Sequence, residues 1–313
     1  MKIGIVGTGG VARRHLAVLT RISDTVLVGH VSQAPGRADA QAAEWGGGAF
    51  TDVEELLAHA RPDAVWVCVT PDRHGPLEGS LIAHGVPFFV EKPLAVDVLT
   101  AETIAARIES TGLITGVGYK FRALDTLPHL RELLQQTPPR MVLGAWHAAL
   151  PSPPWWRSAA RSGGQLVEQA THLVDLARCL VGEGEVVSAI FGRWPRTDVS
   201  DSDVPDVSAA LLRFITPDGS VPGLFSATCL LEGSQAIHLQ LVCEGRVLTL
   251  SERSLIIETG RDRSELANEA DPFKVEDRAF LAAVRQQDPR LVLSSYADAL
   301  KTQRLCCAIR DSV

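Results

Sequence analysis

Hydrophobic positions in the first 120 residues follow two alternating patterns. Short apolar runs of strand length are separated by stretches in which apolar side chains recur every three or four residues, as on one face of a helix. This alternation predicts a parallel sheet wrapped by helices. The predicted strands are Lys2–Val6, Thr25–Ser32, Ala64–Thr70, Pro87–Glu91 and Ile114–Tyr119, and the predicted helices are Val11–Ile22, Gly36–Trp45, Val53–Ala60, Leu77–His84 and Leu99–Ser110.

After about residue 120 the pattern changes. Strands separated by turn signals over 207–258 favour an antiparallel sheet. We therefore predict an α/β protein: a Rossmann doubly wound parallel sheet over 1–120, then a substrate-binding and oligomerisation α+β domain over 121–313, built on a mostly antiparallel open-faced sheet. Its C-terminal helix is free to pack back on the first domain. Its other elements are a strand at Arg140–His147, a loop at Leu150–Gly164 and helices at Leu166–Leu180, Glu276–Arg285 and Tyr296–Arg310.

Composition narrows the class of protein. The 313 residues, 46% hydrophobic with a formal charge of −7, supply two cores and argue against a nucleic-acid binder, which needs a basic face. The start of the chain lacks a secretory leader, and no apolar run reaches the ~18 residues of a membrane helix, so we expect a cytoplasmic protein. The six cysteines lie in apolar stretches without metal-ligand spacing, and we expect buried free thiols and no metal site.

A glycine-rich segment joins the first predicted strand to the first predicted helix. It matches G-x-G-x-x-G/A, in which the glycines allow a tight turn and close backbone approach to a pyrophosphate at a helix N-terminus. The alternative is a glycine-rich turn without a ligand. In the context of several βα units we interpret it as a dinucleotide site formed by Gly7, Thr8, Gly9, Gly10, Val11 and Ala12.

The end of the second strand bears on cofactor choice. Dinucleotide sites specific for NAD usually carry a carboxylate there, but this strand ends at Ser32. No acid repels a 2′-phosphate at this position, and Arg13 and Arg37 are near in sequence. We predict NADP or NAD as cofactor, with NADP favoured; the alternative is that both arginines are solvated helix-surface residues.

Two motifs follow buried strands, where open α/β sheets bind ligands. Thr70-Pro71 with His74 follows the third predicted strand, and Glu91-Lys92-Pro93 ends the fourth. An ammonium group there can bind a substrate hydroxyl and stabilise a developing alkoxide. Taken alone, such a lysine is also compatible with an exposed turn. We expect all of these residues except Pro93 to border the cofactor.

These motifs together resemble the Gfo/Idh/MocA family, named for glucose-fructose oxidoreductase and inositol dehydrogenase. The resemblance runs end to end and includes Gly116-Val117-Gly118-Tyr119, the segment from Ser162 to His172, and Ala299-Leu300-Lys301-Thr302. It implies a two-domain NAD(P)-dependent oxidoreductase. It also implies that Lys92 is catalytic and that His172 serves as acid/base.

Family members that oxidise polyols have an aspartate four residues before that histidine, where this chain has Glu168. Residues i and i+4 share a helix face, so we expect Glu168 and His172 to project together as part of the catalytic group. The longer glutamate weakens any transfer of inositol-type specificity. The alternative is a core histidine beside a surface glutamate.

The proline-stiffened loop before Gly163 carries two tryptophans and an arginine. We expect Trp155 and Trp156 to stack against a sugar face and Arg157 to add hydrogen-bond donors, although either tryptophan is equally suited to covering a domain interface. Tyr119 and Arg122, at the start of the second domain, are further candidates for substrate binding.

The resulting hypothesis is a dehydrogenase or ketoreductase for a secondary alcohol of a sugar, polyol or sugar derivative, with Lys92 and His172 managing the hydroxyl proton. Two alternatives stay open. One is a hydrolase or lyase that retains its dinucleotide and oxidises the sugar transiently; the other is a non-catalytic dinucleotide and sugar sensor. We also expect a homodimer or homotetramer formed through the C-terminal sheet, whose uncovered face we assign from Leu224, Leu239, Leu241 and Leu250.

Overall fold

The computed structural model describes residues 1–196, 199 and 201–312. The chain forms two compact units. Unit 1 contains Met1–Lys120 and Asp271–Leu300, and unit 2 contains Phe121–Ala270 and Lys301–Val313. The predicted second domain, 121–313, left only the C-terminal helix to pack on the first domain, whereas the structure places the whole segment Asp271–Leu300 in unit 1, where it packs on the core.

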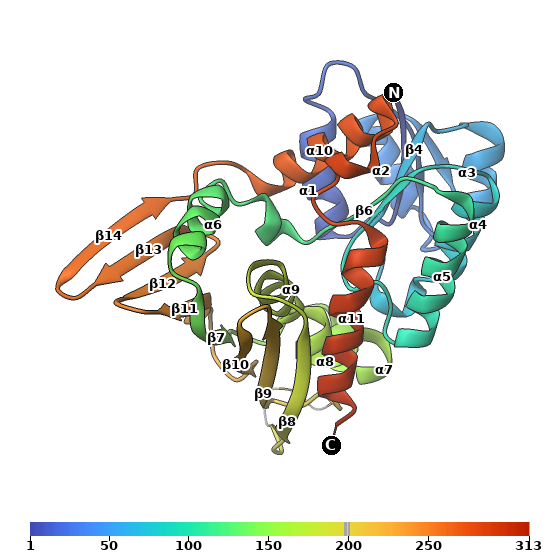
Figure 1. The fold of residues 1–313 in the computed structure, drawn as a ribbon. Coiled ribbons are helices and arrows are strands. Elements are labelled where there is room, and N and C mark those ends of the chain that lie inside the picture. Colours follow the sequence, from blue (N-terminus) through green and yellow to red (C-terminus); the bar gives the residue numbers. More distant parts are fainter. Residues whose placement is uncertain (197–198, 200, 313) are drawn as a thin grey trace. The chain divides into compact units, whose positions relative to one another are not determined.

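Unit 1 is built on a six-stranded parallel sheet with strand order β3-β2-β1-β4-β5-β6 (Figure 1). The chain moves outward from β1 to β3 and then resumes on the other side of β1. This reversal is the topological switch of a doubly wound sheet, and it confirms the predicted fold. The strands are β1 (Lys2–Val6), β2 (Val26–Val31), β3 (Gly48–Phe50), β4 (Ala64–Val67), β5 (Phe88–Val90) and β6 (Thr115–Val117).

Alternating strand residues pack into two separate hydrophobic cores, because successive side chains point to opposite faces of a sheet. Ile5 and Trp66 face α1 and α10, whereas Val65 and Val67 face α3, α4, α5 and the start of α11. The helices of unit 1 are α1 (Gly10–Leu19), α2 (Arg37–Trp45), α3 (Val53–His59), α4 (Pro76–Ala83), α5 (Val98–Thr111) and α10 (Pro272–Gln286), with short 3-10 turns η1 (Pro71–Arg73) and η4 (Pro289–Leu291). The turn η2 (Lys120–Ala123) and helix α11 (Tyr296–Arg310) span the boundaries of the units.

Unit 2 is built on an eight-stranded sheet with order β14-β13-β12-β11-β7-β10-β9-β8. Neighbouring strands are antiparallel except β7 and β10, which run parallel. The strands are β7 (Pro139–His147), β8 (Gly184–Gly192), β9 (Val207–Thr216), β10 (Gly219–Thr228), β11 (Ala236–Cys243), β12 (Arg246–Ser251), β13 (Ser254–Thr259) and β14 (Asp262–Ala267). Its helices are α6 (Leu127–Gln136), α7 (Ala159–Ser162), α8 (Gly164–Glu168) and α9 (Thr171–Leu180), with the 3-10 turn η3 (Pro154–Arg157).

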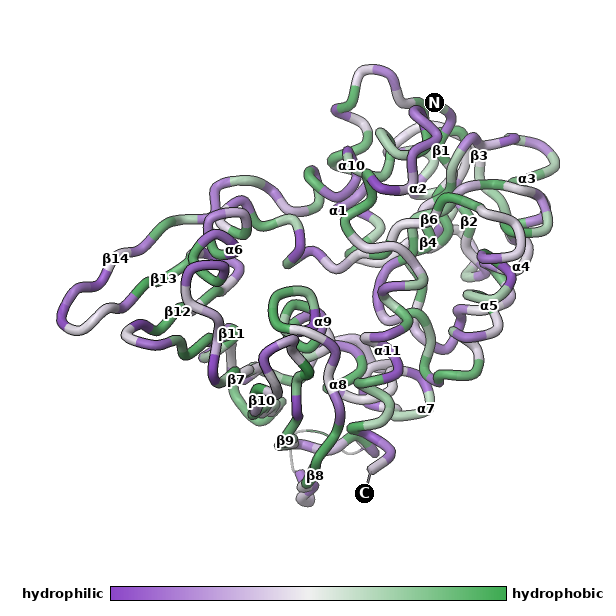
Figure 2. The backbone as a smooth tube through the Cα atoms, viewed as in Figure 1, coloured by the Kyte–Doolittle hydropathy of each residue, from purple (hydrophilic) through white to green (hydrophobic). Residues whose placement is uncertain are grey.

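The four leucines that we expected on the uncovered face of this sheet lie on both of its faces. Leu239, Leu241 and Leu250 are at most 1% exposed and point to the covered side, whereas Leu224 is 49% exposed on the open side. Leu224 lies opposite Leu211 and Leu143 in the strand register, so these leucines form one apolar row across the open face. The β13–β14 hairpin ends in hydrophilic residues (Figure 2). Among the described residues, no helix combines the length and apolar character needed to cross a membrane.

Candidate functional site

The glycine-rich loop lies between β1 and α1 at the carboxyl end of the parallel sheet. Gly7 has φ +110°, and a Cβ at this position would lie 2.0 Å from the carbonyl oxygen of Cys68, so only glycine fits. By contrast, a Cβ on Gly9 or Gly10 would meet no atom within 4 Å. No side chain caps α1 and its first turn carries no acid, which leaves its N-terminal amides for an anion. Thr8 is half-buried and Val11 is exposed, while Ala12 is fully buried and lets α1 pack against the sheet.

A buried hydrogen-bond chain holds this loop from behind. His30 Nε2 donates to the Gly46 carbonyl at 2.8 Å, so its Nδ1 accepts from the Gln41 amide at 3.0 Å. The same Gln41 amide donates to the Gly7 carbonyl at 3.2 Å. Burial lowers the pKa of His30, consistent with the neutral ring that these bonds require.

The end of β2 is the region where the sequence predicts a 2′-phosphate contact. Ser32 Oγ accepts from the amide of Ala34 at 3.3 Å. Arg13 Nη2 lies 2.6 Å from Glu44 on α2, in a half-exposed ion pair, and Arg37 is exposed at the start of α2. The guanidinium of Arg73, from the turn after β4, donates to the side chain of Gln33. Arg73 therefore joins the carboxyl ends of the two strands that flank β1.

The Glu91-Lys92-Pro93 segment leaves the carboxyl end of β5. Glu91 is 7% exposed, and its amide donates to the carbonyl of Val67 on β4 at 2.9 Å. Its carboxylate contacts His15 Nε2 at 3.0 Å. Lys92 follows as a half-buried residue, and the Lys92–Pro93 peptide bond is cis.

The turn after β4 carries the second predicted motif. Thr70 Oγ1 donates to Asp72, and Pro71 is buried at the start of η1. His74 is 4% exposed, and its Nδ1 lies 2.6 Å from Glu78 Oε1 on α4. The other oxygen of Glu78 accepts from the Gly75 amide at 2.6 Å and so caps α4. The His74–Glu78 pair holds the loop that carries Thr70. It engages Nδ1 of the His74 ring in a contact within unit 1.

His172 lies in unit 2, near the start of α9, and is 5% exposed. Its ring stacks on Trp146 with centroids 5.9 Å apart and meets the edge of Phe121 at 5.4 Å. The predicted single helix is interrupted at Gln169 and Ala170, so Glu168 ends α8 and His172 lies at the start of α9. The Glu168 carboxylate accepts from the indole of Trp156 at 2.8 Å.

The other predicted substrate-binding residues have mostly structural surroundings. Trp156 is 1% exposed and packs against Val204 and Cys229, so the expectation that it stacks on a sugar is wrong. Trp155 is half-buried against the same cluster, and Arg157 is half-buried at the end of η3.

Tyr119 and Arg122 are also engaged within the units. Tyr119 is 1% exposed in a hydrophobic core of unit 1. Arg122 forms a two-point ion pair with buried Asp175, with N···O distances of 2.6 and 2.7 Å. Two-point pairing of this kind holds a guanidinium in one orientation.

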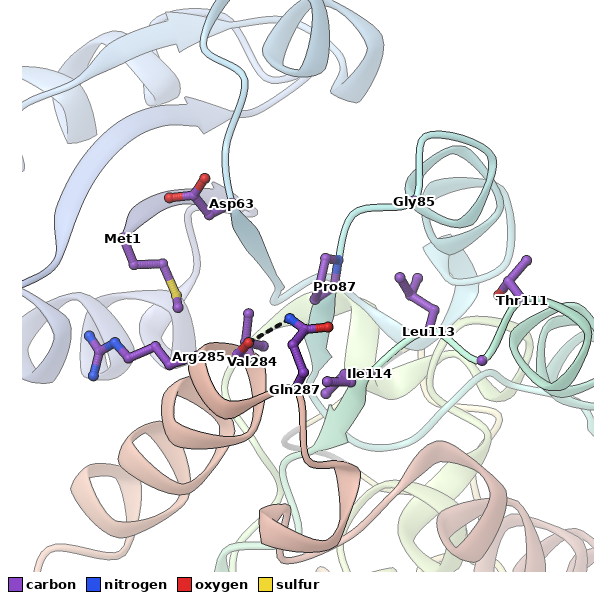
Figure 3. Close-up of a pocket in the computed structure, with 11 residues that line it drawn as sticks. Met1, Asp63, Gly85, Pro87, Thr111, Leu113, Ile114, Val284, Arg285 and Gln287 are labelled. Carbon is purple, nitrogen blue, oxygen red and sulfur yellow. Dashed lines mark hydrogen bonds between the residues drawn. The ribbon is translucent and has the colours of Figure 1, made fainter.

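A surface hollow lies elsewhere in unit 1 (Figure 3). It is lined by residues that immediately precede parallel strands, including Met1, Asp63, Pro87 and Ile114. These residues mark the amino ends of the strands, opposite the edge that carries Gly7 and Lys92. The hollow is therefore separate from the Gly7 loop and from Lys92.

Comparison with known proteins agrees with this arrangement. Residues 1–119 match the oxidoreductase family with an NAD-binding Rossmann fold, and residues 138–248 match the Gfo/Idh/MocA C-terminal domain. The chain belongs to the Gfo/Idh/MocA oxidoreductase family. As a member of this family it is an NAD(P)-dependent oxidoreductase.

Individual relatives of this family member are distant. An uncharacterised protein of Schizosaccharomyces pombe, UNK4.17, is 28% identical over 83% of this chain and 73% of its own length. The myo-inositol 2-dehydrogenase of Thermotoga maritima is 24% identical over 68% of this chain and 65% of its own length. The solved structure of KijD10, a 3-ketoreductase from Actinomadura kijaniata in complex with NADP and TDP-benzene, has a TM-score of 0.85 at 22% identity, covering 100% of this chain and 97% of that chain. The structural likeness shows a shared fold.

Sequence reasoning missed several residues of this family member's site. His15, Gln41, Arg73 and Asp277 hold the loops that carry Gly7, Ser32 and Glu91. For two of them a signal was available: His15 and Asp277 are polar residues at core-facing positions of amphipathic helices, and buried polar groups of this kind need partners.

Proposed function

We propose that this protein is a dehydrogenase or ketoreductase that acts on a secondary alcohol or ketone of a sugar, polyol or sugar derivative. The observation that carries the proposal is the position of Lys92 at the carboxyl end of β5, on the same edge of the sheet as the Gly7 loop. A ligand-binding edge with both features suits a dinucleotide and a substrate oxygen. The names of family members, among them an inositol dehydrogenase and a 3-ketoreductase, support this substrate class.

The residues present fit a dinucleotide. The uncapped N-terminus of α1 offers amides to the pyrophosphate, and the open space at Gly9 and Gly10 admits it. When bound, the nicotinamide supplies hydride chemistry that no side chain can perform. We assign the protein side of the site to Gly7–Ala12, Ser32 and Thr70-Pro71, together with Glu91 and Lys92.

We assign charge stabilisation to Lys92 and proton transfer to His172. The Lys92 ammonium binds the reacting oxygen and stabilises negative charge on it. The imidazole of His172 accepts the hydroxyl proton in the oxidative direction and returns it in the reductive direction. Glu168 acts less directly, since its carboxylate holds the indole of Trp156.

The test is a panel of sugars, inositols and sugar nucleotides assayed with both cofactors by nicotinamide absorbance. On any substrate found, we expect Lys92→Ala and His172→Ala each to lower kcat by ~10²- to 10⁴-fold. His84→Gln is the control, because His84 is exposed on unit 1 and its contacts with Ser80 and Glu54 lie at the surface. Near-full turnover in both active-site variants contradicts the assignment.

We propose a preference for NADP over NAD. Ser32 follows the end of β2 where an acid would exclude a 2′-phosphate, and Arg73 donates a hydrogen bond to the neighbouring Gln33. A guanidinium at this position suits charge-assisted binding of a 2′-phosphate. Arg37 and Arg13 were the sequence candidates; Arg13 is paired with Glu44, so Arg73 and Arg37 are the stronger choices.

We also propose a homo-oligomer formed through the open face of the unit 2 sheet. The support is the row of Leu143, Leu211 and Leu224, in which Leu224 is half-exposed. Contiguous exposed apolar surface of this kind is typical of a protein interface.

The cytoplasm is our proposal for the compartment. The six cysteines are free thiols, and Cys68, Cys229, Cys243, Cys306 and Cys307 are buried. Free thiols are compatible with a reducing compartment. Cell fractionation with an antibody to the protein tests this assignment.

A further inference from the structure

The buried interior of unit 1 contains a charged cluster that the proposed mechanism does not use. His15 on α1 is 0% exposed, and both ring nitrogens face carboxylate oxygens. Nδ1 lies 2.7 Å from Asp277 Oδ1 on α10, and Nε2 lies 3.0 Å from Glu91 Oε1. The aromatic edges of Phe89 and Phe273 lie beside the ring, with centroids 5.3 and 5.1 Å away.

The donor and acceptor count determines the charge of this ring. An ionised carboxylate only accepts hydrogen bonds, and a neutral imidazole has only one N–H, so two such contacts require an imidazolium. Trp66 Nε1 also donates to Asp277 Oδ1, at 2.8 Å, so this oxygen accepts a second hydrogen bond. Burial by itself lowers the pKa of His15, but the charges and hydrogen bonds of Asp277 and Glu91 outweigh it and hold this pKa well above its ordinary value.

Further charged and ionisable groups lie near the imidazolium. Glu276 is buried beside it, and burial together with the charge of Glu91 raises the pKa of Glu276 well above its ordinary value, which favours its neutral form. The pKa of the Cys68 thiol is raised by burial and then by the nearby carboxyl groups of Glu91 and Asp277. Lys120 is a further cation near Glu276, with Nζ 6.0 Å from the centroid of the Phe273 ring, and the guanidinium carbon of Arg14 lies 4.8 Å from the same centroid.

Glu91 is fixed on a second side by Gly118. A Cβ on Gly118 would lie 2.4 Å from Glu91 Oε1, so the carboxylate occupies the space that a side chain after β6 would need. The amide of Glu91 is bonded to β4, and the amide of Gly118 donates to the carbonyl of Val90 at 3.0 Å. His15 and Gly118 thus leave the Glu91 side chain one position, and Glu91 is directly bonded in the chain to Lys92.

We propose that His15, as a buried imidazolium between Asp277 and Glu91, is a positioning residue that fixes Lys92 through Glu91. The contacts of His15 with Glu91 and Asp277 connect the segment after β5, which carries Lys92, to α1 and α10. Helix α10 belongs to unit 1, although it lies far along the chain. The inference rests on the proposed role of Lys92 and deepens it. Lys92 touches the reacting oxygen, and His15 acts only through Glu91.

The first test needs no substrate. In protein labelled with ¹⁵N-histidine, we expect two ring N–H signals from His15 at neutral pH, assigned by their loss in His15→Gln. A ¹⁵N shift typical of a neutral ring overturns the proposal; if His15→Gln fails to fold, the His15 ring is assigned in the wild type by its through-space contacts with the rings of Phe89 and Phe273. Stoichiometric binding of Zn²⁺ by wild-type protein but not by His15→Gln also overturns it, because His15, Glu91 and Glu276 would then be metal ligands; their ligand atoms lie within 4.8 Å of one another.

The second test reads Lys92 directly. The chain has only five lysines, so ¹³C reductive methylation gives few signals, and Lys92→Arg assigns the one from Lys92. We expect the Lys92 signal to move in His15→Gln, to return toward its wild-type position in the double variant His15→Gln/Glu91→Gln, and to stay in place in the control His84→Gln. An unmoved Lys92 signal in folded His15→Gln overturns the proposal.

Kinetic measurements separate the positioning role of His15 from an effect on dinucleotide binding. A misplacement of about 1 Å costs about 10²-fold in rate, so we expect kcat of His15→Gln to fall ~10- to 100-fold while the dissociation constant for the dinucleotide is unchanged. The double variant should recover part of this loss. An equal loss of kcat and dinucleotide affinity contradicts the inference. If both NMR results hold but no sugar or polyol is turned over, the proposed function fails and the positioning role of His15 stands.

Discussion

His15 Nδ1 and Asp277 Oδ1 lie 2.7 Å apart in the interior of unit 1, although 262 positions separate them in the chain. This bond joins the first helix of the Rossmann sheet to α10, which follows the whole of the unit 2 sheet in sequence. Both side chains are fully buried, so each depends on the other for its charge.

Removing one partner of this pair should destabilise the protein strongly. In Asp277→Ala, His15 loses its nearer carboxylate and Trp66 loses its acceptor. Breaking a buried ion pair in this way costs ~3–5 kcal/mol, measured as the free energy of unfolding in urea. Glu54→Gln is the control: its pair with His84 is exposed, and it should cost less than about 1 kcal/mol. A loss for Asp277→Ala no larger than for the control contradicts the buried charge pair.

The Gly7 loop gives a contrast between two glycines. Gly7→Ala places a Cβ 2.0 Å from the Cys68 carbonyl at positive φ, so we expect a loss of stability of ~1–3 kcal/mol or more together with lost dinucleotide binding. Gly9→Ala meets no protein atom, and we expect an unchanged Tm with weaker dinucleotide binding, because the new methyl group occupies the phosphate space. Tm and fluorescence titration with reduced dinucleotide measure both. Equal affinity in wild type and Gly9→Ala contradicts the placement of the pyrophosphate.

His30 should make stability depend on pH. Its pKa in the folded protein is lowered by burial below the ordinary 6.5, so the unfolded chain binds the proton more readily. The stability that neutral His30 contributes is therefore complete above pH 6.5 and is lost as the pH falls toward the folded pKa. We expect the difference in free energy of unfolding between wild type and His30→Gln to shrink on acidification. A difference that grows as the pH falls disproves the neutral tautomer bonded to Gln41.

Arg73 should control cofactor preference. If its guanidinium binds the 2′-phosphate, Arg73→Ala lowers kcat/KM for NADP by about 10-fold or more, since a charge-assisted hydrogen bond contributes about 1.5–3 kcal/mol. The value for NAD should change little. Arg13→Ala is the matched comparison, because its ion pair with Glu44 is half-exposed and should contribute less. A strong NAD preference in wild type, unchanged in Arg73→Ala, Arg37→Ala and Arg13→Ala, contradicts the proposal.

The open face of the unit 2 sheet is tested at Leu224. Leu224→Lys places a charge in the apolar row with Leu143 and Leu211, and we expect light scattering to show a shift from oligomer to monomer. Val187→Lys is a control on the edge strand β8, where the side chain is already 48% exposed. A monomeric wild type at micromolar concentration rules out the assembly.

The sequence by itself determined the Rossmann sheet, its glycine loop and the family. These follow from local signals: the period of apolar residues sets strand or helix, and the spacing Gly7 to Ala12 is dictated by one turn against one helix. The position of Lys92 at a strand end was also predictable, because Pro93 and the preceding buried run mark where β5 stops.

Only the tertiary structure decided which side chains are exposed for binding and which are buried or paired within the protein. Leu224 and Leu239 have equal hydrophobicity, yet strand register places them on opposite faces of the sheet. Trp156 has an aromatic ring suited to stacking but is buried against Val204, and the helix predicted to carry both Glu168 and His172 is divided into α8 and α9. The partnership of His15, Glu91 and Asp277 depends on α10 returning to unit 1. Such contacts arise from packing between distant segments, where one chain position constrains another only after folding has brought them together.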